Sequence, residues 1–444
     1  MKDWKTYFKG KKVTLMGLGL LGRGIGDAKF LAEEGSQLIV TDLKSEEELK
    51  SSITELKDFP NITFHLGGHV AGDFHDRDFV LKAAGVPADS PFIVEARKNK
   101  VPIEMSTSLF AKLSPAMIVG VTGTRGKSTV THLVHEVLKN SYKSGRVFLG
   151  GNVRGVSTLP FLREATAADI VVMELDSWQL QGYAEAGISP HVSIFTTFYP
   201  DHLNYYKGDR DAYLTDKAAI FISQTEKDFL IVGQQCADVV TEKYPDIKSH
   251  VEVVNEKSIP DNWHLRIPGA HNRYDAALAV AALRRLGISE EEIKNGIENF
   301  TGVPGRLEFL KEVRGVKIYN DTTATTPEAT TAALEALGNE KNIVLIMGGA
   351  DKNLDMTGLL KILPKNVKSL ILLPGTGTLR IRNEIKDVEI VDAETLAETV
   401  EKGMQIAQSG DVLLLSPAFA SFGLFKNEFD RGEQFVTLVN NLTQ

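Results

Sequence analysis

The chain has 444 residues, which predicts about three domains at roughly 150 residues each. Hydrophobic residues make up 43% of it, yet no apolar run approaches the roughly 18 residues of a membrane span, so no membrane partner is expected. The net charge of −8, without a dense Lys/Arg block, disfavours nucleic acid as a partner, and a single cysteine excludes an internal disulfide framework. Because the first twelve residues lack a signal-peptide core, we expect a cytoplasmic enzyme.

Short apolar runs alternate with helical patterns along the chain, which predicts an α/β fold with largely parallel sheets. Turn signals at Ser114-Pro115 and in the Gly/Pro-rich stretch 301–305 predict three domains, residues 1–112, 113–302 and 303–444. Strands are predicted, in chain order, at 13–16, 37–40, 117–121, 170–175, 192–195, 229–232, 342–347, 369–373 and 411–415.

A glycine loop follows the first predicted strand. Gly17, Gly19 and Gly22 form a GxGxxG pattern, a helical stretch comes next, and Asp42 stands 20 residues after Gly22 at the end of the next strand. This order is typical of dinucleotide folds, in which glycines let the backbone approach a phosphate. The pattern fits NAD, another nucleotide or a UDP-sugar equally well, and a tight turn without any ligand is the alternative.

A second glycine loop, residues 123–129, carries the strongest signal in the chain. Lys127 would contact phosphate oxygens and Ser128 would offer a hydroxyl to Mg²⁺. The common P-loop spacing would place glycine at 121, where Val121 stands, so this loop is shorter than usual. The following helix is predicted to be amphipathic, with one apolar face formed by Val130, Leu133, Val134, Val137 and Leu138. Two nucleotide sites favour ATP together with a nucleotide-linked substrate.

The short GTxGKST loop resembles that of the ATP-dependent Mur ligase family, whose superfamily includes the folylpolyglutamate synthetases. The resemblance covers essentially the whole chain and is strongest to the ligases that add D-glutamate. Further matching segments follow in order: Gly151-Asn152, 174–180, Asp201-His202-Leu203, Lys217, 269–272, Gly305-Arg306, Asn320-Asp321 and 416–422.

The resemblance implies a Rossmann-like UDP-binding domain, a central P-loop-type ATP-binding domain with a parallel sheet, and a C-terminal Rossmann-like domain for the amino acid. It implies a monomer that adds D-glutamate to UDP-N-acetylmuramoyl-L-alanine in peptidoglycan precursor synthesis. ATP would activate the substrate carboxylate as an acyl phosphate, with the help of two Mg²⁺ ions.

The resemblance also assigns residues to sites. For ATP these are Gly123, Thr124, Gly126, Lys127, Ser128, Thr129, Asn272, Arg306 and Asp321. For the UDP substrate they are Gly17, Leu18, Gly19, Leu20, Asp42 and Asn152. For the amino acid they are Thr325, Lys352, Ser421 and Phe422. Metal ligands would be Ser128, Glu174, His202 and a carbamylated Lys217, and the last three with Lys127 are the expected catalytic residues.

Two departures from the family pattern lie near the amino-acid pocket. Thr323 stands where the family has a lysine, and Glu428 where it has an aromatic residue. A ligase for a different amino acid or acceptor is therefore the alternative within the family. An NAD-dependent oxidoreductase would leave the 123–129 loop without purpose, and a P-loop switch would not need a UDP-linked substrate together with an amino acid.

Overall fold

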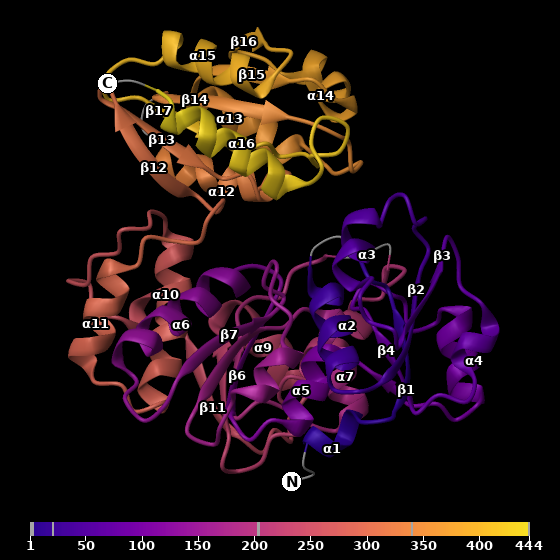
Figure 1. Ribbon diagram of the computed structural model, residues 1–444. Coiled ribbons are helices and arrows are strands. Elements are labelled where there is room, and N and C mark those ends of the chain that lie inside the picture. The colour runs from indigo at the N-terminus through magenta and orange to yellow at the C-terminus, as the bar shows by residue number, and fades with distance from the viewer. Residues whose placement is uncertain (1–3, 20–21, 202–204, 339–340, 443–444) are drawn as a thin grey trace. The chain divides into compact units, whose positions relative to one another are not determined.

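The computed structural model describes residues 4–19, 22–201, 205–338 and 341–442 (Figure 1). It confirms the α/β prediction, because each of the nine predicted strands is present and the strands form three largely parallel sheets. The chain divides into two compact units, Met1–Pro260 with Asp275–Gly296, and Asp261–Tyr274 with Ile297–Gln444. Among the described helices, none is both long and apolar enough to cross a bilayer.

The first sheet has the strand order β3-β2-β1-β4-β5, all parallel, which is the order of a dinucleotide fold. Its strands are β1 (Lys12–Met16), β2 (Gln37–Asp42), β3 (Ile62–Leu66), β4 (Phe79–Lys82) and β5 (Ile103–Glu104). The accompanying helices are α1 (Trp4–Phe8), α2 (Arg23–Glu33), α3 (Lys50–Leu56), α4 (Pro91–Lys98) and α5 (Ser106–Leu113), with a 3₁₀ turn, η1 (Ala71–Phe74).

The second sheet belongs to the same unit and has the order β11-β10-β9-β6-β8-β7, again all parallel. Its strands are β6 (Met117–Thr122), β7 (Val147–Gly151), β8 (Ile170–Glu174), β9 (Val192–Phe195), β10 (Phe229–Gly233) and β11 (His250–Val254). The helices and 3₁₀ turns here are α6 (Lys127–Ser141), η2 (Leu159–Arg163), α7 (Ser177–Ala186), α8 (Arg210–Ala218), α9 (Gln234–Lys243), η3 (Glu256–Ser258), α10 (Ala270–Arg285) and α11 (Glu290–Asn299), the last two shared with the second unit.

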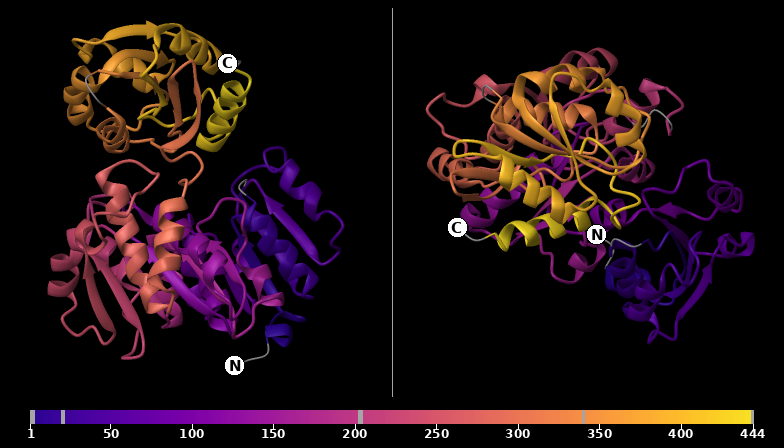
Figure 2. Two further views of the ribbon diagram at one scale, coloured as in Figure 1. Left: turned by 90° about the vertical axis from the view of Figure 1, so that its left-hand side faces the viewer. Right: turned by 90° about the horizontal axis from the view of Figure 1, so that it is seen from above.

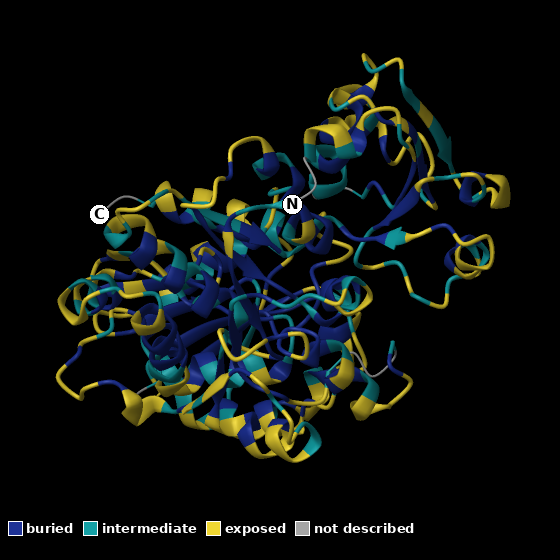
Figure 3. Ribbon diagram, turned by 90° about the horizontal axis from the view of Figure 1, so that it is seen from below, coloured by how far each residue is buried: buried dark blue, intermediate teal, exposed yellow. Residues whose placement is uncertain are grey.

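Burial explains why the central strands are visible as apolar runs in the sequence. Every residue of β8 and β9 is buried, as expected for parallel strands covered on both faces. The predicted apolar face of α6 is buried as well. In Figure 3 many strands are dark blue, whereas most of the yellow, exposed residues lie on loops and helices.

The third sheet lies in the second unit and has the order β12-β13-β17-β14-β15-β16, with one antiparallel pair, β12 and β13. Its strands are β12 (Glu308–Val313), β13 (Val316–Asn320), β14 (Ile343–Gly348), β15 (Val367–Leu373), β16 (Glu389–Asp392) and β17 (Val412–Leu415). The helices and 3₁₀ turn are α12 (Pro327–Leu337), α13 (Thr357–Asn366), α14 (Thr376–Ile381), η4 (Arg382–Glu384), α15 (Leu396–Ile406) and α16 (Glu428–Asn440).

Alternation along β14 shows that this sheet is covered on both faces. Leu345 and Met347 pack in one cluster with α12 and α13, whereas Val344 and Ile346 pack in another with α15 and α16. Successive side chains of a strand point to opposite faces, so one continuous apolar run supplies two cores. Figure 2 shows helices on both sides of these strands.

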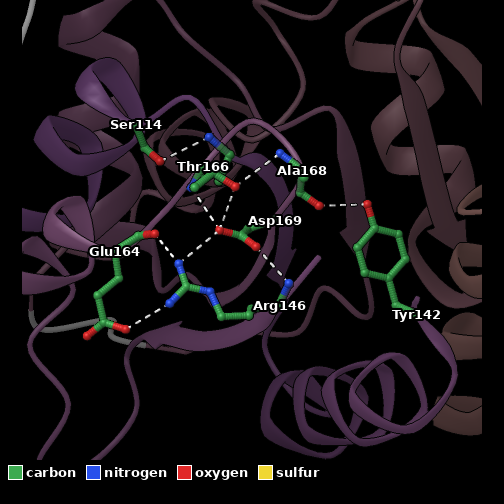
Figure 4. A network of polar contacts seen from close by, with 8 residues as sticks. Ser114, Tyr142, Arg146, Glu164, Thr166, Ala168 and Asp169 are labelled. Atoms are coloured by element: carbon green, nitrogen blue, oxygen red, sulfur yellow. Dashed lines mark hydrogen bonds and ion pairs between the residues drawn. The ribbon is translucent and has the colours of Figure 1, made fainter. Parts of the chain in front are cut away.

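A polar network anchors the start of β8, at the opposite end of that strand from Glu174 (Figure 4). The buried Asp169 accepts hydrogen bonds from the backbone N–H groups of Arg146 at 2.6 Å and Thr166 at 2.7 Å. The Arg146 guanidinium also lies 3.3 Å from the carboxylate and contacts Glu164. Burial opposes ionisation of Asp169, but these hydrogen bonds prevail and lower its pKa.

We expect Asp169→Asn to lower the free energy of unfolding by about 1–3 kcal/mol at neutral pH, because an amide places a donor against backbone donors. The lowered pKa means that the carboxylate stabilises the fold above the usual value near 3.8, and that this contribution is lost as the pH falls through the lowered value. Denaturant unfolding across pH 3–8 measures both effects. Glu164→Gln, on the exposed rim of the network, is the control; an equal loss in both variants would contradict the assignment.

Candidate active site

The 123–126 loop joins β6 to α6 and requires glycine at both ends. Gly123 has φ of 143° and Gly126 has φ of 83°. A Cβ atom at Gly123 would lie 2.0 Å from the Thr196 hydroxyl, and one at Gly126 would lie 2.3 Å from an Asp275 carboxylate oxygen. Backbone conformation and lack of space therefore both demand glycine here.

The segment after β9 holds this loop in place. The backbone N–H of Thr124 donates to the Thr197 carbonyl at 2.7 Å, and that of Arg125 donates to the Thr197 hydroxyl at 2.9 Å. The Thr124 hydroxyl is buried and accepts from the backbone N–H of Tyr199 at 3.0 Å. The Thr124 side chain thus helps to hold the loop in its observed conformation.

Lys127 begins α6, and its ammonium group folds back over the loop. It donates to the carbonyls of Gly123 and Thr124, both at 3.1 Å. A cation at a helix N-terminus opposes the helix dipole, so the residue adds nothing to helix stability from that position. Phosphate groups are bound well where a lysine ammonium and a glycine-containing loop lie at the N-terminus of a helix. The 123–126 loop, Lys127 and the start of α6 provide this combination.

Glu174 and Ser128 lie together beneath the loop. The Ser128 hydroxyl donates to Glu174 Oε2 at 2.6 Å, and the side-chain amide of Asn152 lies 3.4 Å from Oε1. Glu174 is 5% exposed and Ser128 8%. Gly151 permits this approach, because a Cβ there would lie 2.1 Å from the Glu174 carbonyl oxygen.

A hydroxyl and a carboxylate are ligands that suit Mg²⁺. In the described part of the chain, no group of three or more His, Cys, Asp or Glu side chains could hold a metal ion. His202, the expected metal ligand, falls outside the described residues. Among the described residues, Ser128 and Glu174 are therefore the pair that could contribute to a metal site here.

Lys217 on α8 is a lysine with 1% exposure. Its ammonium nitrogen donates to the Gly123 carbonyl at 2.7 Å and lies 4.8 Å from the centre of the Tyr213 ring. Burial, followed by the nearby charge of Lys127, holds the pKa of Lys217 well below its usual value. Two lysines thus meet at one carbonyl oxygen, and the pKa of the more deeply buried one, Lys217, is lowered.

A cavity of about 220 Å³ lies against the first glycine loop and includes Gly17, Leu18 and Gly19 in its lining. Asp42 does not line it: the carboxylate accepts from the backbone N–H groups of Gly19 at 3.1 Å and Lys44 at 3.0 Å, and so holds the loop in shape. Leu20 lies outside the described residues.

Three charged residues that no sequence motif singled out also line this cavity: Arg23, Asp27 and Lys82. Asp27 accepts from the hydroxyls of Ser106 at 2.8 Å and Ser157 at 2.5 Å, and burial raises its pKa to about 6. Burial lowers the pKa of Lys82 to about 8. A charged residue on the apolar face of the helix, beside Ala28 and Leu31, was the available signal for Asp27.

In the second unit, two of the four residues assigned to the amino acid lie together. The Lys352 ammonium donates to the Thr325 hydroxyl at 2.9 Å. Ser421 is buried, and the Phe422 side chain is 67% exposed. The hydroxyl of Thr323, which replaces the family lysine, donates to the Gly305 carbonyl at 2.9 Å.

The remaining ATP-assigned residues also lie in the second unit. Asp321 is buried and accepts from the Leu307 backbone N–H at 3.0 Å and the Ser416 hydroxyl at 2.8 Å. Burial raises the pKa of Asp321 to about 7, although both bonds and the charge of Arg306 oppose the rise. The exposed Arg306 follows Gly305, and the Asn272 amide donates to the Pro268 carbonyl at 2.6 Å.

Two family models match the chain, the Mur ligase middle domain over residues 121–258 and the Mur ligase glutamate ligase domain over residues 305–419. A UDP-N-acetylmuramoylalanine--D-glutamate ligase from Roseiflexus sp. is 35% identical over 98% of this chain and 99% of its own length. The fold is similar to that of MurC from Thermotoga maritima (TM-score 0.62, 22% identity, covering 97% and 99% of the two chains). It is also similar to MurF from the same organism in complex with ADP (TM-score 0.57, 16% identity, 98% and 95%).

We expect Gly123→Ala to weaken binding of a non-hydrolysable ATP analogue at least about tenfold, since alanine costs about 1–3 kcal/mol in this backbone region and its Cβ would displace Thr196. Calorimetric titration measures the affinity. Gly187→Ala is the matched control, because Gly187 also has positive φ (63°) but open space around it. Equal analogue affinity in both variants would show that the loop shape is not required.

Proposed function

This chain belongs to the Mur ligase family, and we propose that it adds D-glutamate to UDP-N-acetylmuramoyl-L-alanine at the expense of ATP, in peptidoglycan precursor synthesis. The name of the Roseiflexus relative, which matches nearly the full length of both chains, supports this substrate pair. We further propose a cytoplasmic monomer with three functional domains, residues 1–112 for the UDP substrate, 113–302 for ATP and 303–444 for the amino acid.

One observation carries the proposal: Asn152 and Glu174 connect the residues that follow the first glycine loop with those of the second, through contacts with Arg23 and Ser128. Glu174 pairs with Ser128 of the ATP loop, and Asn152, next to the cavity residue Gly151, lies 3.4 Å from Glu174. A dehydrogenase or a P-loop switch needs only one of the two loops. A ligase that phosphorylates a UDP-linked carboxylate needs both within reach of one another.

The residues at the ATP loop would orient and neutralise phosphate groups. Lys127 and the loop N–H groups would hold the phosphates of ATP, and Ser128 and Glu174 would hold Mg²⁺, which neutralises phosphate charge when bound. ATP supplies the phosphoryl group that turns the substrate carboxylate into an acyl phosphate. The amine of D-glutamate then attacks the acyl carbon, forms the amide bond and releases phosphate, while a proton leaves the nitrogen.

Lys217 fits a carbamylated ligand. A neutral amine can attack CO₂ and lose a proton to give a carbamate, which replaces a cation with an anionic oxygen donor. The lowered pKa of Lys217 keeps the amine neutral more readily, and the short distance to the phosphate loop would bring the new oxygens to the ATP site. His202 is proposed as the neighbouring ligand from the family pattern alone.

Lys352 and Thr325 are proposed to form part of the binding pocket for the amino acid. Their contact at 2.9 Å places an ammonium and a hydroxyl side by side, which suits one carboxylate of D-glutamate. Ser421 and Phe422 are proposed to complete this pocket. Asn272, Arg306 and Asp321 are proposed to contact ATP.

A phosphate-release screen with UDP-N-acetylmuramoyl-L-alanine, ATP and a panel of D- and L-amino acids tests the function. We expect release with D-glutamate, and a fall of at least about 100-fold in Lys127→Ala, because the transferring phosphoryl group loses its cation. Release that needs no UDP-linked substrate would favour a switch. Release with another amino acid but not with D-glutamate would keep the ligase and change the acceptor.

Carbamylation can be tested with ¹³C-labelled bicarbonate and carbon NMR. We expect a carbamate signal that is absent from Lys217→Arg and retained in Lys227→Ala, an exposed lysine in the same domain. The signal should weaken as the pH falls, because protonation removes the nucleophilic amine. A fully active enzyme with a free Lys217 amine by mass spectrometry would refute the modification.

A further inference from the structure

Arg23 is a cavity residue for which the family pattern offers no role. It is the first residue of α2, is half-buried, and lines the cavity with Gly17 and Gly19. The positive end of the helix dipole disfavours a cation at this position, so helix stability does not explain the choice of arginine. Asp27, four residues further along α2, already interacts electrostatically with Arg23, and an anion bound in the cavity would give the guanidinium a second anionic partner.

A line of three polar contacts runs from Arg23 to the phosphate loop. The guanidinium donates to Asn152 Oδ1 at 2.7 Å, the Asn152 amide nitrogen lies 3.4 Å from Glu174 Oε1, and Glu174 Oε2 accepts from Ser128 at 2.6 Å. A guanidinium can only donate and a carboxylate can only accept. Arg23 therefore fixes which way the Asn152 amide faces, with its oxygen toward α2 and its nitrogen toward Glu174.

We propose that Arg23 binds the diphosphate of the UDP-linked substrate and is a positioning residue that sets Asn152 toward Glu174. This inference rests on the proposed function, since it takes a UDP-linked molecule as the occupant of the cavity. The planar guanidinium carries five N–H donors that match phosphate oxygens in pairs. Lys82, the other cation in the lining, donates to the Val86 carbonyl at 2.7 Å. Arg23 is thus the cation that can serve the cavity and the Asn152 contact together.

Binding without ATP tests the diphosphate contact. Calorimetry with UDP and with uridine should show that Arg23→Ala weakens UDP binding about tenfold or more and leaves uridine binding within about twofold. Arg23→Lys should recover part of the affinity for UDP, because charge remains while the paired geometry is lost. Arg154→Ala is the charge-matched control: Arg154 is exposed, lies two residues after Asn152 and does not line the cavity. Thermal unfolding midpoints check that each variant is folded.

A double-mutant cycle tests the positioning role. If Arg23 acts through Asn152, kcat of Arg23→Ala/Asn152→Ala should fall no further than kcat of Asn152→Ala alone. Additive losses in kcat, or a UDP affinity of Arg23→Ala within about twofold of the wild type, would overturn the inference. These results are independent of the amino-acid screen: a wild type that binds UDP through Arg23 but does not ligate D-glutamate would overturn the proposed function alone.

Discussion

The buried carboxylate of Glu174 is the constraint on which this site depends. A carboxylate out of water costs several kcal/mol unless donors surround it, and here Ser128 and Asn152 supply them. Ser128 lies in the first turn of α6, which follows β6, and Asn152 directly follows β7. Both reach Glu174 because β6 and β7 flank β8 and run parallel to it, so that all three strands finish at one edge of the sheet. Glycine at position 151 leaves room for the neighbouring Glu174 backbone, and the 123–126 loop leads the chain from β6 to the helix that carries Ser128.

Two lysine ammonium groups lie at the same edge, with several carboxylates acting on one of them, Lys217. Lys127 and Lys217 both donate to the Gly123 carbonyl, and their proximity together with burial disfavours a second ammonium. The net charge of −8 for the whole chain says nothing of this local field.

Most of the strands that the sequence revealed are largely buried, although the fully buried β4 went unpredicted. Runs such as 170–173 and Ile343–Gly348 carry no polar side chain, so they stand out without any tertiary information. The strands that went unpredicted include the two-residue β5 and the half-exposed β3, β12 and β16, whose mixed composition resembles that of loops. Length and burial thus decide what periodicity can detect.

The sequence by itself determined the two glycine loops, because each is encoded by a short stretch of consecutive residues. In the second loop the glycines, the lysine and the hydroxyl groups all lie within residues 123–129. It also determined the family, since the matching motifs extend along the whole chain. Only the tertiary structure decided that Asp42 and Thr124 support their loops, that Lys217 is buried against Gly123, and that Arg23 and Asn152 connect the cavity to Glu174. Arg23 and Asn152 lie 129 positions apart, and proximity of that kind arises when sheets assemble, which no local pattern encodes.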